Sequence, residues 1–134
     1  MTPELAKKLY DKHGAVFKFE KTDPASPTNF FMFGIECGDG WYDILNHLLF
    51  CISAHQKDAK KHNPDYVDIE IQQIKEKFGT LRFYYSGGDD YIEGLVRLAE
   101  AMTETTCEVC GNKGKYTDTG WIRTLCDEHA KNES

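Results

Sequence analysis

Four metal-binding side chains lie close together near the end of the sequence. Cys107 and Cys110 form a Cys-x-x-Cys pair, and Cys126 and His129 form a Cys-x-x-His pair after fifteen intervening residues. Three thiolates and one imidazole at this spacing can surround one zinc ion as a closed tetrahedron. Since a closed shell leaves no position for a reacting water molecule, the pattern predicts a structural zinc ion and no catalysis at the metal.

The residues around these ligands predict how the chain holds them. Gly111 directly follows the second cysteine and lets the backbone amides turn toward the sulfur atoms. Residues 113–123 are long enough for a hairpin, and a short helix beginning at Leu125 would place Cys126 and His129 on one face. This order of knuckle, hairpin and helix resembles the treble-clef type of zinc finger.

A β-hairpin is predicted upstream of the zinc pattern. Residues 67–78 alternate between apolar and polar side chains, apart from a one-residue slip at 72–73 that indicates a bulge. Gly79 and Thr80 suit a two-residue turn with glycine at its first central position, and residues 81–85 form the returning strand. The hairpin therefore has one mostly apolar face, which we expect to meet the helices.

The opposite face of this hairpin carries cations. With the predicted turn, Lys77 lies across from Arg82 and Lys75 lies across from Tyr84. Two like charges directly opposed cost about 0.2–1 kcal/mol, so this face is a candidate site for an anion such as phosphate. Tyr84 offers a ring on which a nucleobase can stack, with Trp41 as a second stacking surface. The alternative is a solvated face whose cations pair with carboxylates from elsewhere in the chain.

Carboxylates and a histidine gather around a glycine turn at residues 38–40. Glu36, Asp39 and Asp43 flank this turn, and His47 follows on the same predicted helix face as Asp43. These groups could perform acid–base chemistry or hold a second metal. The simpler interpretation assigns the two aspartates to the turn and the helix N-terminus and leaves the histidine in solvent. We favour it, and keep a small hydrolase using Asp39, Asp43 and His47 as a weaker alternative.

The remaining elements must position these candidate sites. Two amphipathic helices carry apolar stripes, formed by Trp41, Ile44, Leu45, Leu48 and Ile52 in the first and by Ile92, Leu95, Leu98, Ala99 and Met102 in the second. Asp90, with Glu93 three residues later, is the predicted N-cap of the helix that carries the second stripe. The other predictions are a helix over 3–12, a loop over 20–30, a strand over 30–37 and a solvated linker over 56–66.

These elements predict an α+β fold. Two or three helices would pack on a small antiparallel sheet in residues 1–104, with the treble-clef-like zinc module in residues 105–134 packed on that domain. Cys37 and Cys51 are left over from the zinc pattern, and we expect them to be reduced core thiols rather than a disulfide.

Composition restricts the classes of partner. The chain has 134 residues, 40% of them hydrophobic, and a net charge of −6. An acidic chain is a poor duplex-DNA binder, because duplex affinity depends on neutralising phosphates. No apolar run reaches the roughly 20 residues of a membrane span, and the first residues lack the apolar core of a signal peptide. We therefore expect a cytoplasmic protein that binds neither duplex DNA nor membranes.

Residues 33–43, 74–85 and 107–129 together resemble a family of small, mostly uncharacterised proteins encoded by phages and prophages. The resemblance covers residues 31–129 and departs from the family's pattern at 51–66, which is longer and more charged. It implies a viral protein acting in the host cytoplasm and carries over no catalytic residue. Small non-catalytic phage proteins often antagonise host immunity, for example by sequestering a nucleotide-type signal.

The sequence thus predicts a non-enzymatic, anti-defence binding protein with structural Zn²⁺. Its ligand would be a small phosphorylated molecule such as a nucleotide immune signal, bound by Lys75, Lys77, Arg82, Tyr84 and Trp41. The alternative is an adaptor that binds a host protein or single-stranded nucleic acid through Tyr116, Trp121 and Arg123 of the zinc module. The ligand's identity and the formation of a homo-oligomer are left open.

Overall fold

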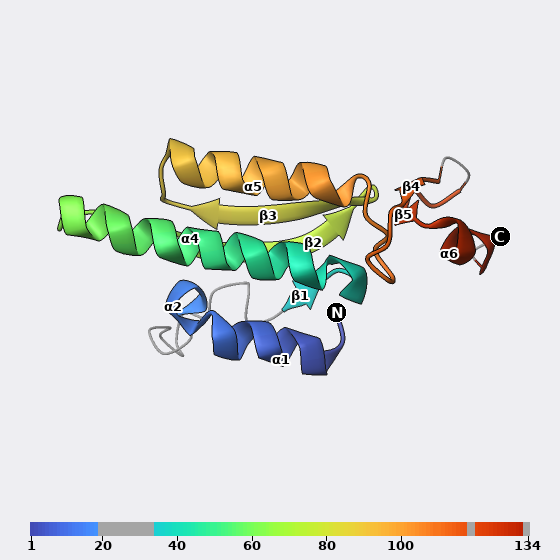
Figure 1. The fold of residues 1–134 in the computed structure, drawn as a ribbon, viewed down its shortest axis with the longest axis horizontal. Helices are drawn as coiled ribbons and strands as arrows, with labels where there is room; N and C mark the ends of the chain where they lie inside the picture. The colour runs from blue at the N-terminus through green and yellow to red at the C-terminus, as the bar shows by residue number, and fades with distance from the viewer. Residues whose placement is uncertain (19–33, 118–119, 133–134) are drawn as a thin grey trace.

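A computed structural model describes residues 1–18, 34–117 and 120–132 of the chain. The loop predicted over 20–30, and the first part of the strand predicted over 30–37, lie outside these residues. Figure 1 shows the described elements, which are α1 (Pro3–Lys12), α2 (Gly14–Phe17), β1 (Ile35–Glu36), η2 (Asp39–Trp41), α4 (Tyr42–His62), β2 (Glu70–Lys77), β3 (Thr80–Ser86), α5 (Asp90–Thr103), β4 (Lys115–Tyr116), β5 (Thr124–Leu125) and α6 (Asp127–Asn132).

The main sheet has the strand order β1-β2-β3, with helices on one face. Strands β2 and β3 form an antiparallel hairpin, whereas β1 runs parallel to β2, so the sheet is mixed and not antiparallel throughout as predicted. Helices α4 and α5 lie side by side along this sheet, while β4, β5 and α6 lie beyond the end where the β2–β3 hairpin turns (Figure 1). The α+β class predicted from the sequence is confirmed.

The predicted apolar stripe of α4 forms the centre of the core. All five of its residues are buried, and Trp41 and Leu45 have no exposed surface. They pack with apolar side chains of the sheet, since one hydrophobic cluster contains the stripe together with Ile35, Ile71, Ile74, Leu81 and Phe83. The helical period of the sequence therefore identified the buried face of α4 correctly.

Helix α4 is longer than the sequence suggested, and the solvated linker predicted from residue 56 is wrong. The helix continues to His62 because this stretch consists largely of residues that favour helices. Gln56 is buried, and its Oε1 accepts a hydrogen bond from the backbone N–H of Ile69 at 2.8 Å. Gln56, which the sequence places in a solvated linker, is therefore a buried residue that hydrogen-bonds the segment leading into β2.

The N-cap of helix α5 lies one residue before the predicted one. Asp89, not Asp90, is the N-cap, and its Oδ1 accepts a hydrogen bond from Ile92 N at 3.0 Å. The buried stripe is Ile92, Val96, Ala99 and Thr103, whereas Leu98 and Met102 are exposed, contrary to the prediction.

The reason for this rotation is the polar edge of β3. Thr103 Oγ1 accepts a hydrogen bond from Leu81 N at 3.0 Å, and a Glu100 carboxylate oxygen accepts one from Phe83 N at 3.0 Å. Helix α5 therefore turns two polar side chains toward the strand, which hydrophobic periodicity does not detect.

The turn of the β2–β3 hairpin is one residue earlier than predicted. Phe78 and Gly79 are its central residues, both with positive φ (53° and 80°), as in a type I′ turn, and Lys77 pairs with Thr80. Gly79 N donates to Glu76 Oε2 at 2.8 Å, which stabilises the turn. The predicted bulge is confirmed as a register shift between residues 71 and 73.

The earlier turn changes the cross-strand partners of β2 and β3, but it leaves the side chains of the two strands on their predicted faces. Lys75 lies opposite Arg82, and Tyr84 lies opposite Gln73, so the predicted Lys77–Arg82 and Lys75–Tyr84 pairs are wrong. One strand is displaced by two residues relative to the prediction. Because side chains alternate with a period of two, the side chains of β2 and β3 keep their predicted faces. Phe78 does not, because it lies in the turn and is 61% exposed.

Candidate metal centre and ligand-binding face

The four predicted metal ligands meet at one point in the C-terminal module. The ligand atoms of Cys107, Cys110, Cys126 and His129 all lie within 4.8 Å of one another. The Sγ–Sγ distance between Cys110 and Cys126 is 3.8 Å, and His129 Nδ1 lies 3.6 Å from Cys107 Sγ and 3.2 Å from Cys126 Sγ. These side chains converge although they come from separate segments.

These distances fit a four-coordinate metal ion. Metal–sulfur bonds of about 2.3 Å and metal–nitrogen bonds of about 2.0 Å place tetrahedral S···S and S···N pairs about 3.8 and 3.5 Å apart. A disulfide would instead require about 2.05 Å between sulfurs. The donors are soft thiolates and one imidazole, a set typical of closed structural sites.

Local backbone structure delivers each pair of ligands. In the knuckle, Gly111 N donates to Cys107 O at 2.9 Å, and Cys107 N donates to Asn112 O at 2.7 Å. At the other pair, Cys126 directly precedes α6, and Ala130 N donates to its carbonyl at 2.9 Å. Strands β4 and β5 connect the two halves as a hairpin, which reaches Leu125 and not only residue 123. The helix therefore begins at Asp127, and the prediction that it begins at Leu125 is wrong.

The same backbone geometry favours the thiolate form of Cys107. Burial of the side chain opposes ionisation, but amide N–H groups of residues 126, 110 and 109 donate to its sulfur and lower the pKa of Cys107 to about 6. A thiol that ionises near neutral pH is ready to coordinate a metal without a large proton cost.

Glu108, between the knuckle cysteines, attaches this module to the main domain. Its side chain is buried, and Oε2 accepts a hydrogen bond from Gly38 N at 2.9 Å while Oε1 lies 3.5 Å from Arg123 Nη2. Its carbonyl also accepts from Gly40 N at 2.7 Å. A buried carboxylate with an ion pair and a backbone donor is well compensated, so it orders the junction.

Trp41 belongs to this junction and not to a ligand surface. It has no exposed surface, and its Nε1 donates to Thr106 O at 2.9 Å. Close contact is possible because residue 40 is glycine, where a Cβ atom would lie 2.1 Å from Cys107 O. The prediction that Trp41 stacks on a ligand is therefore wrong, because the module covers it.

The cationic residues predicted on the hairpin do share one face. Lys75 pairs with Arg82 across the strands, and Lys75 Nζ lies 5.9 Å from the centre of the Tyr84 ring. Lys77 Nζ lies 5.6 Å from the ring of Phe78, at the tip of the hairpin. Within the described part of the chain, none of these three cations forms an ion pair, and Arg82 Nε is buried without a hydrogen-bond partner.

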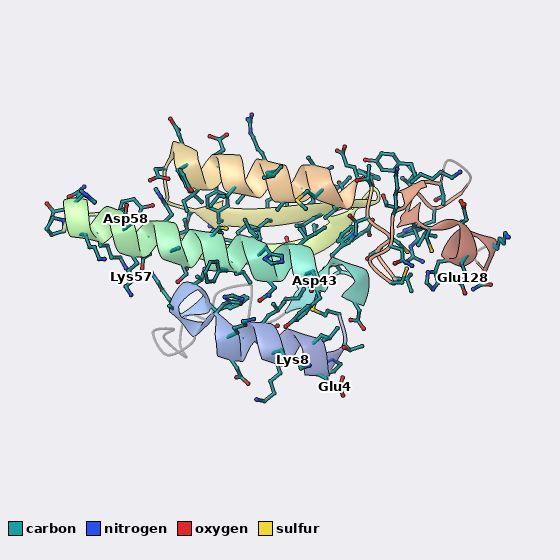
Figure 2. The ribbon with its side chains drawn as sticks, viewed as in Figure 1. Glu4, Lys8, Asp43, Lys57, Asp58 and Glu128 are labelled. Carbon is teal, nitrogen blue, oxygen red and sulfur yellow. The ribbon has the colours of Figure 1, made fainter. Side chains whose placement is uncertain are left out.

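The acidic turn does not assemble into one site. Asp39 Oδ1 accepts a hydrogen bond from Thr2 N at 2.7 Å, while Glu36 Oε1 contacts Gln73 at 3.4 Å. Asp43 and His47 are exposed and line a cavity of about 190 Å³ between α4 and α5, which Asp39 does not line. Figure 2 shows Asp43 at the N-terminal end of α4.

Two polar clusters were missed from the sequence. His55 Nε2 lies 2.7 Å from Asp89 Oδ2, and its ring stacks on Tyr91 at 4.1 Å. Asp68 binds Lys60 at 2.6 Å and Lys18 at 3.0 Å. In both cases the partners come from different elements of the fold, so only the N-cap position of Asp89 could have given a signal.

The two leftover cysteines are free thiols. Cys37 is buried, and this burial raises the pKa of its thiol to about 12. Cys51 is half-buried on α4, beside the cavity between α4 and α5. Neither thiol is paired in a disulfide, as expected for core thiols.

Comparisons with protein-family models, curated proteins and solved structures gave no match to this chain. Among the helices of the described residues, none combines the length and the apolar character that crossing a bilayer requires.

Proposed function

We propose that the four-ligand cluster binds one zinc ion in a structural role. Three thiolates and one imidazole suit zinc in its usual tetrahedral geometry, and all four positions are taken by protein. Among the described residues of the module, the buried apolar cluster consists of Cys107, Leu125 and Cys126, with Ala130 beside it, which is too small to fold about 30 residues alone. The metal supplies the missing free energy.

Metal content tests this proposal directly. Protein purified without chelators should contain one equivalent of zinc by elemental analysis, and Cys126→Ser should reduce that content strongly. Cys37→Ser is the matched control, because it removes a buried thiol outside the cluster. Much less than one zinc per chain in the wild-type protein would contradict the proposal.

We propose that the protein as a whole is a non-enzymatic binding protein for a small phosphorylated ligand. The observation that carries this proposal is the placement of Lys75 directly opposite Arg82, with Lys77 and Tyr84 on the same face. Glu36 is the neighbour of Lys75 on β1, yet no ion pair within 4.0 Å joins them. Unpaired, adjacent cations beside a tyrosine ring suit a phosphate with an attached base.

A thermal-shift panel of cyclic dinucleotides, ADP-ribose isomers and nucleoside monophosphates tests this function, because a ligand of the native state raises the melting temperature. Lys75→Ala and Arg82→Ala should remove the shift while leaving the unfolding temperature without ligand nearly unchanged. Lys8→Ala, an exposed lysine of α1, is the control (Figure 2). If no compound shifts the wild-type protein, or both variants bind as it does, this function is excluded.

The narrower proposal is a phage-encoded sponge for a nucleotide immune signal. Support for it is the sequence resemblance together with a cation-bearing face and a metal centre that has no free coordination position. A sponge should release its ligand chemically unchanged after denaturation, as measured by mass spectrometry. Recovery of a hydrolysed product would instead favour the hydrolase alternative with Asp39, Asp43 and His47.

An adaptor function has one specific observation in its favour. Trp121 is 79% exposed and Tyr116 is 47% exposed on the metal module, an unusual position for large aromatic side chains. Binding of single-stranded nucleic acid by stacking would quench the Trp121 fluorescence on titration with oligo-dT, and Tyr116→Ala would weaken that binding. Unchanged fluorescence would exclude stacking of nucleic acid on Trp121, and a host protein would remain as the partner to test.

A further inference from the structure

The outer side of α4, opposite its buried stripe, carries one continuous line of exposed positions. From residue 42 to residue 57 the exposed residues are Asp43, His47, Phe50, Ala54 and Lys57. They recur at alternating spacings of four and three residues, which is the pattern along which one helix packs against another in a coiled coil. The line therefore has the geometry of a helix–helix contact.

The middle of this line is apolar, and the apolar surface continues onto α5. Phe50 is 64% exposed, and on the neighbouring helix Leu98 is 61% and Met102 is 47% exposed. Next to Phe50 along the chain, Cys51 lines the cavity of about 190 Å³ between the two helices, together with Leu98 and Met102. An apolar patch of this kind on a folded protein indicates a surface that another molecule covers. It also accounts for Leu98 and Met102, which the apolar period of α5 predicted to be buried.

The two ends of the line carry opposite charges. Asp43 lies seven residues before Phe50 and Lys57 seven residues after it, so each is about 10.5 Å from Phe50 along the helix axis. Figure 2 shows Asp43 and Lys57 toward opposite ends of α4. At about 21 Å along the axis they are too far apart to pair within one chain, and neither forms an ion pair with a described residue. Opposite charges at equal distances from a central apolar residue make the line complementary to a reversed copy of itself.

We propose that this face binds a second copy of the chain, with the two α4 helices antiparallel and a two-fold axis at Phe50. In such an isologous contact, every contact between two residues forms twice, once in each direction. Asp43 of each copy therefore lies opposite Lys57 of the other, so one geometry forms two ion pairs. A parallel arrangement would place Asp43 against Asp43 and Lys57 against Lys57, and opposed like charges weaken association.

The cavity beside α4 provides space for the central ring. In the antiparallel pair, Phe50 of each copy lies level with Phe50 and Cys51 of the other, at the edge of the other copy's cavity. An apolar cavity of about 150 Å³ can hold benzene, so about 190 Å³ is sufficient for a phenyl ring. The contact shares no residue with the Lys75–Arg82 face, so it is independent of the ligand site proposed above.

Sedimentation equilibrium of the full chain as purified measures this association. The average mass of the wild type should rise from 15.3 kDa toward twice that value as the concentration increases from about 1 µM to about 1 mM. Phe50→Glu brings two carboxylates together at the axis and should weaken dimerisation by at least about tenfold. Because Phe50 is exposed in the monomer, this variant should fold normally. Lys8→Gln, an exposed position on α1, gives the same net charge and is the matched control.

A charge exchange tests the antiparallel register. Asp43→Lys and Lys57→Asp each set like charges opposite one another twice per dimer, so each variant alone should self-associate at least about tenfold more weakly than the wild type. A mixture of the two should form a one-to-one complex in native mass spectrometry, because both contacts between the copies then join opposite charges. Lys8→Asp has the same net charge as Lys57→Asp, and it should not restore association when mixed with Asp43→Lys.

Three outcomes would overturn the proposal. A wild-type mass that stays at 15.3 kDa up to about 1 mM would exclude a second copy as the occupant of this face. A dimer that Phe50→Glu leaves intact, in a variant whose thermal unfolding matches the wild type, would place the interface elsewhere. A mixture of the two charge variants that associates no better than either alone would reject the antiparallel pairing. None of these outcomes changes the ligand binding expected of the hairpin face, which Lys75→Ala and Arg82→Ala test separately.

Discussion

Gly40→Ala is the substitution that most directly tests how the metal module is attached. A Cβ atom at this position would lie 2.1 Å from Cys107 O and 2.6 Å from Gly111 N, whereas ordinary contacts begin at 3.4 Å. Both neighbours are backbone atoms of the metal-binding knuckle, which cannot rotate away as a side chain can. The knuckle and the start of α4 must therefore separate by more than an ångström.

The expected loss of stability follows from the contacts at this junction. Separation breaks the hydrogen bond from Gly40 N to Glu108 O, at 2.7 Å, and disturbs the one from Trp41 Nε1 to Thr106 O, at 2.9 Å. Each bond contributes about 0.5–1.5 kcal/mol, and overpacking costs a further 1–3 kcal/mol or so. We expect the free energy of unfolding to fall by about 3 kcal/mol.

Urea denaturation of the metal-loaded protein, followed by tryptophan fluorescence, measures this loss. With a typical slope of about 1–3 kcal/mol per molar, the midpoint should fall by about 1–3 M. Gly94→Ala is the control, because nothing lies within 4 Å of its added Cβ in α5 and the change should stabilise the helix by about 0.5–1 kcal/mol. A Gly40→Ala midpoint within error of the wild type would refute the description of a tight junction.

Three further results are expected. Removing the metal with a chelator should expose amides of residues 105–132 to hydrogen exchange while the core of α4 stays protected, and full protection of both regions would contradict a metal-dependent module. Phe78→Gly should stabilise the protein by about 0.5–1 kcal/mol in thermal unfolding, because it relieves a left-handed conformation in an exposed residue. Since the pKa of Asp68 is lowered in the folded state, its contribution is present above the unfolded pKa of about 3.9 and is lost as the pH falls through the folded pKa. The difference in unfolding free energy between wild type and Asp68→Asn should therefore shrink below about pH 4, and a constant difference would show that the charge does not matter.

Local patterns predicted much of this fold because local physics determines those parts. The spacing of the four metal ligands, the buried stripe of α4 and the bulge at residues 71–73 each depend on periodicity or on short loops. The helix over 3–12 is confirmed for the same reason, since proline at its start and an amphipathic pattern define it.

The errors arise where distant contacts decide the outcome. Trp41 belongs to the predicted apolar stripe and is also a candidate stacking ring, and only its packing in the core and the hydrogen bond from its Nε1 to Thr106 O decide between these two roles. The hairpin turns at Phe78 and Gly79, one residue earlier than predicted, although a bulky residue at positive φ is unfavourable. The distant Thr124 stabilises this turn, because its Oγ1 donates a hydrogen bond to the Gly79 carbonyl at 2.7 Å. A cavity beside Asp68 joins α2, α4 and the segment before β2, and no sequence period connects these three.

The polar contacts of α5 with β3 have a consequence for association between molecules. Outward-pointing amides on a terminal strand ordinarily invite another strand to extend the sheet. Here the amides of Leu81 and Phe83 are already bonded by Thr103 and Glu100, at 3.0 Å each. Helix α5 thus protects this edge against intermolecular β-pairing, whereas many proteins protect such an edge with charged or proline residues on the strand itself. The solubility of the protein should therefore depend on the side chains of Thr103 and Glu100.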